Sequence, residues 1–210
     1  MCTWQRIERL QKTIDMLKVQ TYKDFTFCIW NNNPDIKNEI DKIISATNLK
    51  IEVHHNPENI GGLGRFYFAK QKDGIIIFID DDLEFDETMV KYFVDTYKPK
   101  HISSWHAFKI KGGYWNREQV HSGDCDYAGT GGMVADSSVF KDSRLFSELP
   151  DEYKFVEDLW LCYFAKYEHS YKIQACAPNI WAINDGKNQC NNSFKTKDLF
   201  LTELKRRYLK

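Results

Sequence analysis

The sequence predicts an α/β fold in which a mixed, mostly parallel β-sheet is flanked by helices. Two observations support this fold class. Helical and strand-like patterns alternate up to about residue 98, and this alternation predicts βαβ units with right-handed crossovers. The apolar run 74–79 does not alternate with polar residues, which is typical of a strand buried on both faces within a parallel sheet.

Each element follows from its own spacing or composition. Apolar residues at helical spacing predict a helix over 7–18, and the apolar run 25–30 predicts a strand. Up to about residue 98, the sequence then predicts a helix over 36–44, a strand over 51–53, a helix opened by the glycines 61–64, the apolar strand 74–79 and a helix from near 86. The remainder predicts a strand over 101–110, a glycine-rich turn at 129–132, a helix from about 155, a strand over 171–176 and a last helix from about 197.

The start of the chain is unusual for this fold class. A helix over 7–18 needs a strand before it in a βα unit, but only residues 1–4 are available. Either that strand is very short, or the sequence begins late within it. No linker or low-complexity stretch divides the chain, so we expect a single domain over 1–210.

Composition and charge exclude several classes of protein. Lys and Arg number 29 against 30 Asp and Glu, and the net charge of -1 predicts no affinity for nucleic acid or anionic membrane. No apolar run approaches the length of a membrane span, and no signal peptide is expected. The 6 cysteines include no CxxC pair, so reduced thiols and a cytoplasmic location are expected.

Three consecutive carboxylates follow the apolar strand at Asp80, Asp81 and Asp82. Ligands of open α/β sheets bind beyond the carboxyl ends of such strands, and carboxylates crowded there repel one another unless a cation offsets them. Hard oxygen ligands favour Mg²⁺ or Mn²⁺. Because successive strand residues point in opposite directions, Asp80 and Asp82 can converge while Asp81 turns away, but this alternation can fail near the end of a strand. The alternative is an acidic turn before the next helix.

Two further segments carry candidate site residues. Gly61, Gly62 and Arg65 stand at a predicted helix start, where backbone N–H groups and a guanidinium can bind phosphate. The alternative is a tight turn packed between a strand and a helix. Glu157 and Asp158 lie at another predicted helix start, where they can act in acid–base chemistry or complement the helix dipole.

Six short motifs occur in a particular order along the chain. They are Thr3-Trp4-Gln5-Arg6, residues 20–25, Asn59-x-Gly61-Gly62, Asp80-x-Asp82, Gly129-Thr130-Gly131-Gly132-Met133 and Glu157-Asp158. Together they extend from residue 3 to about 165, and their order resembles that of family 2-type glycosyltransferases with the GT-A fold. Within that family, the chain is similar to small N-terminal glycosyltransferase domains of chlorovirus enzymes that build capsid glycans.

This resemblance implies an inverting transfer of a sugar from a nucleotide-diphosphate donor to a glycan hydroxyl. The implied donor is a UDP-hexose or UDP-deoxyhexose such as glucose or rhamnose, and a viral enzyme would act in the host cytoplasm. Asp82 would contact Mn²⁺ or Mg²⁺ directly, while Asp80 would hold a metal-bound water or the ribose. Asp158 would be the general base, and Glu157 would hold an acceptor hydroxyl or a neighbouring loop.

The resemblance also implies a set of donor-binding residues. Asn31 stands where many relatives carry an Asp that contacts the pyrimidine, although an Asn carbonyl can still accept a hydrogen bond from uracil. His106 is either a ligand of sugar hydroxyls or a structural histidine. The loop 185–189 is expected to close over the donor, and His169 does not match the metal-binding histidine of some relatives. The full set is Thr3, Trp4, Arg6, Asn31, Asn59, Gly61, Gly62, Arg65, Asp80, Asp81, His106 and Gly131.

Two other functions fit parts of the sequence. A phosphotransferase of the haloacid-dehalogenase type also places Asp-x-Asp after an apolar strand, and release of phosphate from an aryl phosphate would support it. A catalytically silent module that binds sugar nucleotides or glycans would bind nucleotide without turnover or donor hydrolysis.

Overall fold

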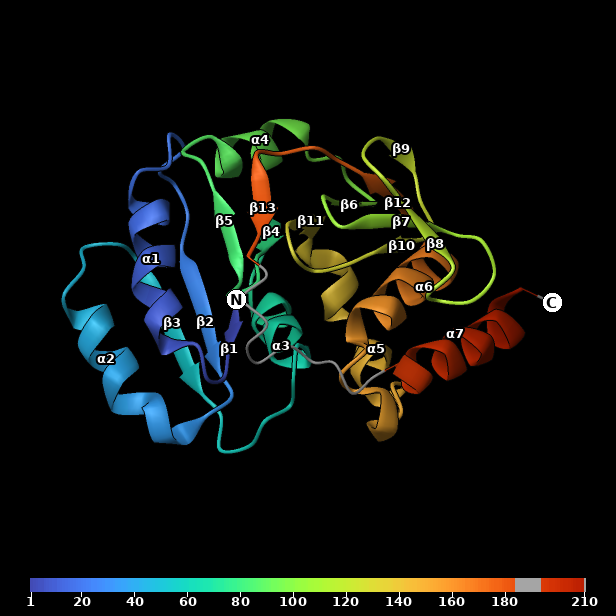
Figure 1. Cartoon of the computed structure of the whole chain (residues 1–210), viewed down its shortest axis with the longest axis horizontal. Coiled ribbons are helices and arrows are strands. Elements are labelled where there is room, and N and C mark those ends of the chain that lie inside the picture. The colour runs from blue at the N-terminus through green and yellow to red at the C-terminus, as the bar shows by residue number, and fades with distance from the viewer. Residues whose placement is uncertain (184–193, 210) are drawn as a thin grey trace.

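The computed structural model describes residues 1–183 and 194–209, and shows an α/β fold with a mixed sheet (Figure 1). The helices are α1 (Ile7–Lys18), α2 (Lys37–Ser45), α3 (Leu63–Gln71), α4 (Met89–Thr96), α5 (Arg144–Ser147), α6 (Glu157–His169) and α7 (Phe194–Tyr208). The strands are β1 (Cys2–Thr3), β2 (Phe27–Asn31), β3 (Ile51–His55), β4 (Ile75–Phe78), β5 (Leu83–Phe85), β6 (His101–Ser104), β7 (Ala107–Ile110), β8 (Arg117–Val120), β9 (Gly123–Asp124), β10 (Tyr127–Ala128), β11 (Met133–Asp136), β12 (Lys172–Ala175) and β13 (Ile180–Ala182).

The first part of the chain forms the predicted βαβ units. Strands β1, β2 and β3 pair in parallel, and α1 and α2 lie beside this sheet at one end of the molecule (Figure 1). The apolar positions Leu10, Ile14 and Leu17 are buried on one face of α1, as their spacing requires. Alternation of helix and strand therefore predicted both the elements and their parallel pairing in this part.

The apolar strand differs from its prediction. Strand β4 stands at the end of the five-stranded sheet β4-β11-β6-β12-β9 and pairs antiparallel with β11. Ile75 is 37% exposed, so the strand is not buried along both faces. The expectation of parallel neighbours was wrong because β11, which returns from the second half of the chain, covers one edge of β4. Parallel pairing in this sheet is found between β6 and β12.

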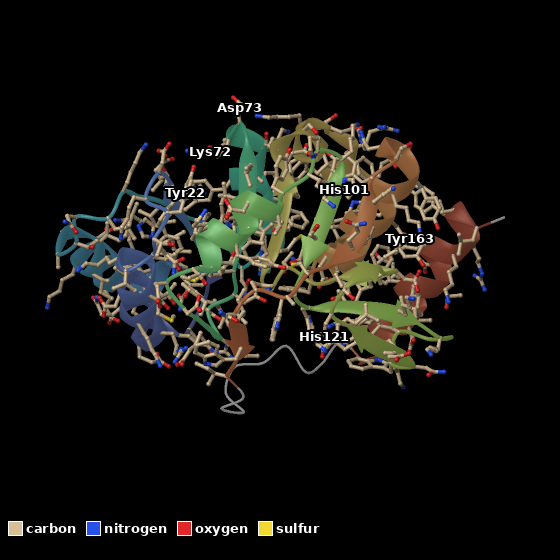
Figure 2. All side chains as sticks on the ribbon, turned by 90° about the horizontal axis from the view of Figure 1, so that it is seen from above. Tyr22, Lys72, Asp73, His101, His121 and Tyr163 are labelled. Carbon is tan, nitrogen blue, oxygen red and sulfur yellow. The ribbon has the colours of Figure 1, made fainter. Side chains whose placement is uncertain are left out.

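A cleft of about 430 Å³ lies along the other edge of β4, between β4 and β2. Side chains of α3 and α4 line it, and Tyr22, Lys72 and Asp73, which also line it, are labelled in Figure 2. Strand β1 is only two residues long, and the amino group of Met1 donates a hydrogen bond to the Cys28 carbonyl (2.9 Å) inside the cleft. Burial lowers the pKa of this amino group.

The predicted strand 101–110 is two strands, β6 and β7, which belong to different sheets. The break falls at Trp105 and His106, whose backbone bonds to the glycine turn instead: the Trp105 N–H donates to the Gly132 carbonyl (2.8 Å), and the His106 carbonyl accepts from Gly129 (2.8 Å). A non-local backbone pairing therefore divides a stretch that is uniformly strand-like in sequence.

The buried apolar residues form two cores. The N-terminal core gathers apolar residues of α1, α2, α4 and β2, and the C-terminal core surrounds α6, with α7 packed against that helix. Within the described residues, no helix combines the length and apolarity needed to cross a membrane. The predicted loop 185–189 lies outside the described residues.

Candidate active site

The turn between β4 and β5 carries the three consecutive carboxylates. Arg6 Nη1 lies 3.0 Å from Asp81 Oδ1 and 3.1 Å from Asp82 Oδ2, and Arg65 Nη1 forms an ion pair with Asp80. The expectation that Asp81 turns away from Asp82 was wrong. Strand β4 ends at Phe78, so the alternation of strand side chains no longer applies at residues 80–82, and a turn brings Asp81 and Asp82 to the same arginine.

The electrostatics of this turn reflect its partial burial. Burial raises the pKa of Asp81 to about 6, against the opposing effect of Arg6, and the neighbouring Asp80 and Asp82 raise it further. Burial by itself would lower the pKa of Arg65, but Asp80 and other nearby acidic groups raise it well above its ordinary value. Arg6 and Arg65 thus supply positive charge next to Asp82 and Asp80, the two carboxylates expected to bind a metal ion.

Arg65 connects the carboxylate turn with the glycine-rich turn 129–132. Its guanidinium donates to Thr130 Oγ1 (2.8 Å) and to the Gly62 carbonyl (3.2 Å), in addition to its ion pair with Asp80. Gly131 lies directly against the Asp80 carboxylate, since a Cβ at this position would be 2.9 Å from Asp80 Oδ2. Three segments of the chain, at residues 62–65, 80–82 and 129–132, therefore meet at one guanidinium.

The glycine segment 61–62 packs against the start of α6. Gly61 has φ +62°, and the Asn59 side chain accepts a hydrogen bond from its N–H (2.9 Å). A Cβ on Gly62 would overlap Glu157 Oε1, so only glycine allows this approach. The tight, packed turn is therefore present, and it brings the N-terminus of α3 to Glu157.

Glu157 and Asp158 occupy the first turn of α6 but have different surroundings. Glu157 is 5% exposed, and burial together with the nearby Asp158 raises its pKa to about 7. Asp158 is half-buried; its Oδ1 accepts from the Leu159 N–H (2.8 Å), and its Oδ2 accepts from the Tyr127 hydroxyl. Asp158 is thus the more accessible acid of the pair.

The N-terminal candidates lie near the carboxylate turn. Trp4 is 43% exposed, so its indole ring is accessible. Its backbone carbonyl accepts a hydrogen bond from Asn33 Nδ2 (2.9 Å). Thr3 is buried, and its hydroxyl has no hydrogen-bond partner among the described residues. Arg6 is buried against Asp81 and Asp82.

Asn31 is fully buried and its amide is already hydrogen-bonded. The Nδ2 group donates to the Asn33 carbonyl (2.7 Å) and contacts His55 Nδ1 (3.0 Å), while Oδ1 accepts from the Asn33 N–H (2.9 Å). Since His55 Nε2 lies 3.0 Å from Asp41 Oδ1, the ring donates from Nε2 and accepts at Nδ1. Asn31 therefore organises the loop after β2, and it would have to exchange one of these partners to contact a base.

His106 lies between the carboxylate turn and the start of α6. Burial lowers its pKa, Arg117 lowers it further, and Asp158 and Asp80 oppose this effect. A neutral imidazole at neutral pH follows, and such a ring can both donate to and accept from hydroxyl groups. His106 is therefore close enough to both Asp80 and Asp158 to experience their charge.

Sequence reasoning missed Tyr127 and Thr130 as members of the site. Thr130 belongs to the glycine-rich motif, so its place in that motif was the available signal. Tyr127 carries no local signal, because an aromatic residue in a short strand is most often part of the core. Arg117 lies against the rings of Tyr114 (4.0 Å) and Phe108 (4.1 Å), near the same site.

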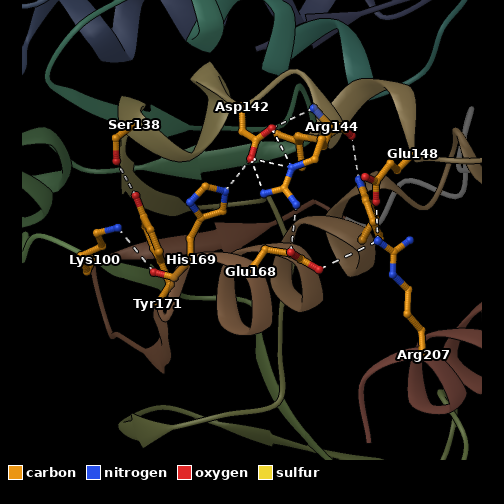
Figure 3. Close-up of polar contacts among 11 residues, drawn as sticks. Lys100, Ser138, Asp142, Arg144, Glu148, Glu168, His169, Tyr171 and Arg207 are labelled. Atoms are coloured by element: carbon orange, nitrogen blue, oxygen red, sulfur yellow. Dashed lines mark hydrogen bonds and ion pairs between the residues drawn. The ribbon is translucent and has the colours of Figure 1, made fainter.

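His169 belongs to a different polar network, at the C-terminus of α6 (Figure 3). Its Nε2 lies 3.0 Å from Asp142 Oδ2, and Asp142 also pairs with Arg144, which extends to Glu168. Hydrogen bonds from Arg144 hold the pKa of Asp142 down at about 2. His169 is engaged in this network rather than with the carboxylate turn.

The donor atoms of the carboxylate turn suit a hard divalent cation. Within the described residues, no three His, Cys, Asp or Glu side chains converge on a common point. Mg²⁺ sites, however, commonly use one or two carboxylates and take their other ligands from phosphate and water. Asp82 and Asp80, at the half-exposed edge of the turn, fit that donor set.

Comparisons with solved structures show that the fold is shared with larger glycosyltransferases. S. aureus TarS 1–349 in complex with UDP has a TM-score of 0.60 and 17% identity, covering 86% of this chain and 58% of that one. GalNAc-T7 with UDP, GalNAc and Mn²⁺ has a TM-score of 0.60 and 10% identity, covering 92% of this chain and 45% of that one. The chain therefore spans about half the length of these proteins.

Comparisons at the level of sequence identify the family. No curated protein sequence gave a significant match. Residues 1–156 match the family described as Glycosyl transferase family 2, and this range contains the carboxylate turn, the glycine segment and the glycine-rich turn. The chain therefore belongs to glycosyl transferase family 2 and has its GT-A fold.

Proposed function

We propose that this chain transfers a sugar from a UDP-sugar to a glycan hydroxyl, with inversion at the anomeric carbon. The observation that supports this most directly is the contact between the carboxylate turn and the start of α6. Arg65 pairs with Asp80 and donates to the Gly62 carbonyl (3.2 Å), and Gly62 packs directly against Glu157, the neighbour of Asp158. A leaving-group side and an acceptor side are thus adjacent, as a displacement reaction requires.

The carboxylate turn forms the donor side in this proposal. Asp82 and Asp80 would hold Mn²⁺ or Mg²⁺, which supplies neutralising charge for the diphosphate leaving group when it is bound. Arg65 and Arg6 already lie at these carboxylates, and each guanidinium is a suitable donor to phosphate oxygens. The solved relatives with UDP and with UDP, GalNAc and Mn²⁺ support this assignment.

The base and ribose would lie at the N-terminal candidates. The accessible indole of Trp4 offers a stacking surface, and the buried hydroxyl of Thr3 offers a hydrogen bond that the described residues leave unused. Asn59, Gly61 and Gly62 shape the wall next to the nucleotide, and Asn31 holds the loop beside it. A UDP-hexose or UDP-deoxyhexose, such as glucose or rhamnose, is the proposed donor.

Asp158 is the proposed general base. Its half-buried carboxylate would accept the proton of the acceptor hydroxyl as that oxygen attacks the anomeric carbon, and His106 would bind a sugar hydroxyl nearby. One carboxylate on the acceptor side implies a single displacement and inverted configuration. Glu157, buried beside Gly62, would hold the start of α6 against the segment 59–62, which lies next to the nucleotide in this proposal.

Replacement of the base tests this function. Asp158→Asn keeps the shape of the side chain but cannot accept the proton, so turnover should fall by roughly 10²–10⁴-fold while UDP binding is unchanged. The exposed Asp151→Asn, also a carboxylate-to-amide change, is the matched control and should retain normal turnover. NMR coupling constants should show inverted configuration in the product.

Four results would contradict the proposal or favour its rivals. Retained configuration, or near-normal turnover by Asp158→Asn, would exclude Asp158 as the base of an inverting transfer. Binding of UDP-sugar without either transfer or donor hydrolysis would favour a silent binding module. Release of phosphate from an aryl phosphate would favour a phosphotransferase.

A further inference from the structure

A chain of two tyrosine hydroxyls ends at the Asp158 carboxylate. Tyr114 donates its hydroxyl hydrogen to the Tyr127 hydroxyl (3.2 Å), and Tyr127 in turn donates to Asp158 Oδ2. Both tyrosines are almost fully buried. Tyr127 lies on β10, which packs against α6, so two different elements of the fold hold the same carboxylate.

The direction of these hydrogen bonds is determined by the surroundings of Tyr127. Burial, together with Asp158 and Tyr114, raises the pKa of Tyr127 well above its ordinary value. Tyr127 therefore keeps its proton at neutral pH, and it can only donate to an ionised carboxylate. The other oxygen of Asp158 accepts from the Leu159 N–H (2.8 Å). Each Asp158 oxygen thus has one donor from the protein, and further acceptor capacity remains on both.

The rings that carry these hydroxyls have little freedom. Tyr127 is stacked on Phe108 with ring centroids 5.9 Å apart, and β10 pairs with β7 at this position. The Arg117 guanidinium covers the faces of Tyr114 (4.0 Å) and Tyr127 (5.4 Å). Aromatic rings packed in this way can fix a hydrogen-bond donor to within the tolerance that catalysis needs.

We propose that Tyr127 is a positioning residue for Asp158, and that Tyr114 supports it. The hydroxyl of Tyr127 fixes the rotation of the Asp158 carboxylate so that a free lone pair faces the acceptor hydroxyl. This inference rests on the proposed role of Asp158 as the base. The alternative is that Tyr127 and Tyr114 are core residues whose hydroxyls merely avoid being unpaired.

Removal of one oxygen distinguishes these possibilities. Tyr127→Phe keeps the ring and its packing, so the melting temperature should stay high enough for assay. With a UDP-sugar donor, kcat should fall by roughly tenfold, as expected for loss of one hydrogen bond to a charged group, while the KM for the donor is unchanged.

Two further variants separate the hydrogen bond from packing. Tyr114→Phe should produce a smaller fall in kcat. Tyr163→Phe, which alters another buried tyrosine on α6, is the matched control and should leave kcat unchanged.

The outcomes separate this inference from the proposed function. If Asp158→Asn is inactive but Tyr127→Phe has normal kcat, the tyrosines are structural and the inference is wrong. If both variants retain normal turnover, Asp158 is not the base and the proposed function itself fails. An equal fall in kcat for Tyr127→Phe and Tyr163→Phe would indicate general loss of packing and would also overturn the inference.

Discussion

Glu157 and Asp158 show how neighbouring residues of the same charge acquire different properties. Glu157 points into the contact between α3 and α6, where Gly62 leaves room for its carboxyl group. Asp158 remains half-buried and is hydrogen-bonded by Tyr127 and by the backbone of Leu159. Perturbed carboxyl groups cluster at functional sites, and here a step of one residue separates a buried acid from an accessible one.

The raised pKa of Glu157 predicts a dependence of stability on pH. In the folded protein this pKa is about 7, against an ordinary value of 4.5. The carboxyl group is therefore protonated more readily in the folded state. Its contribution to stability is fully present below about pH 4.5 and is lost as the pH rises to about 7.

Glu157→Gln should remove this dependence. Relative to the wild type, the variant should gain roughly 1–3 kcal/mol of unfolding free energy between about pH 5 and pH 8. Urea unfolding at several pH values measures the gain. The exposed Glu152→Gln is the control and should follow the wild type throughout. Parallel curves for Glu157→Gln and the wild type would show that Glu157 is not protonated at neutral pH in the folded protein.

At the scale of elements, a cleft separates β2 from β4, and these two strands belong to different sheets. Strand β1 covers β2 only opposite Trp30 and Asn31, and β4 is paired along one edge alone among the described strands. Apolar side chains from α3 and α4 line the two faces of the cleft. A strand that filled it would need apolar side chains on both faces, because helices cover both.

Extension of the chain ahead of Met1 tests this description. Addition of Val-Ile-Val-Ile should lengthen β1 into the cleft, bury apolar surface between two strand edges and raise the melting temperature by roughly 2–8 °C. Addition of Gly-Ser-Gly-Ser has the same length but no apolar side chains, and it should give no increase. Equal melting temperatures for the two extended proteins would show that the cleft does not accept a strand.

At the scale of the whole molecule, the site is made where two cores meet. Arg6 and Arg65 join the N-terminal segments to the carboxylate turn, and Gly62 joins them to α6. A divalent ion with UDP would add a further link between these parts. Ligands that bind only the native state raise its stability, so the proposed donor complex should be visible as a thermal shift.

The proposed metal site predicts a cation-dependent affinity for UDP. In the wild type, Mn²⁺ should tighten UDP binding at least roughly tenfold relative to EDTA, and Asp82→Ala should lose this gain while remaining folded. Asp95→Ala, an exposed acid on α4, should behave as the wild type. Calorimetry measures both affinities. Equal wild-type affinity in Mn²⁺ and in EDTA would exclude the metal role of Asp82.

Local sequence was sufficient for the elements of the first half of the chain. Helices α1, α2 and α3 and strands β2 and β3 follow from spacing and composition within about ten residues, because side-chain periodicity is a local property. The order of short motifs was sufficient to identify the family, since a motif keeps its place relative to the strands and helices around it. The roles assigned to residues 80–82 and 157–158 stay predictions.

Only the tertiary structure decided which groups meet. The antiparallel partner of β4, the break in the predicted strand 101–110 and the shared arginine of Asp81 and Asp82 all depend on contacts between residues far apart in sequence. Tyr127 reaches Asp158 for the same reason, since its strand and α6 are brought together only by packing of the C-terminal core. Periodicity determined which side of each element faces inward, whereas the close packing of those sides determined each side chain's partners.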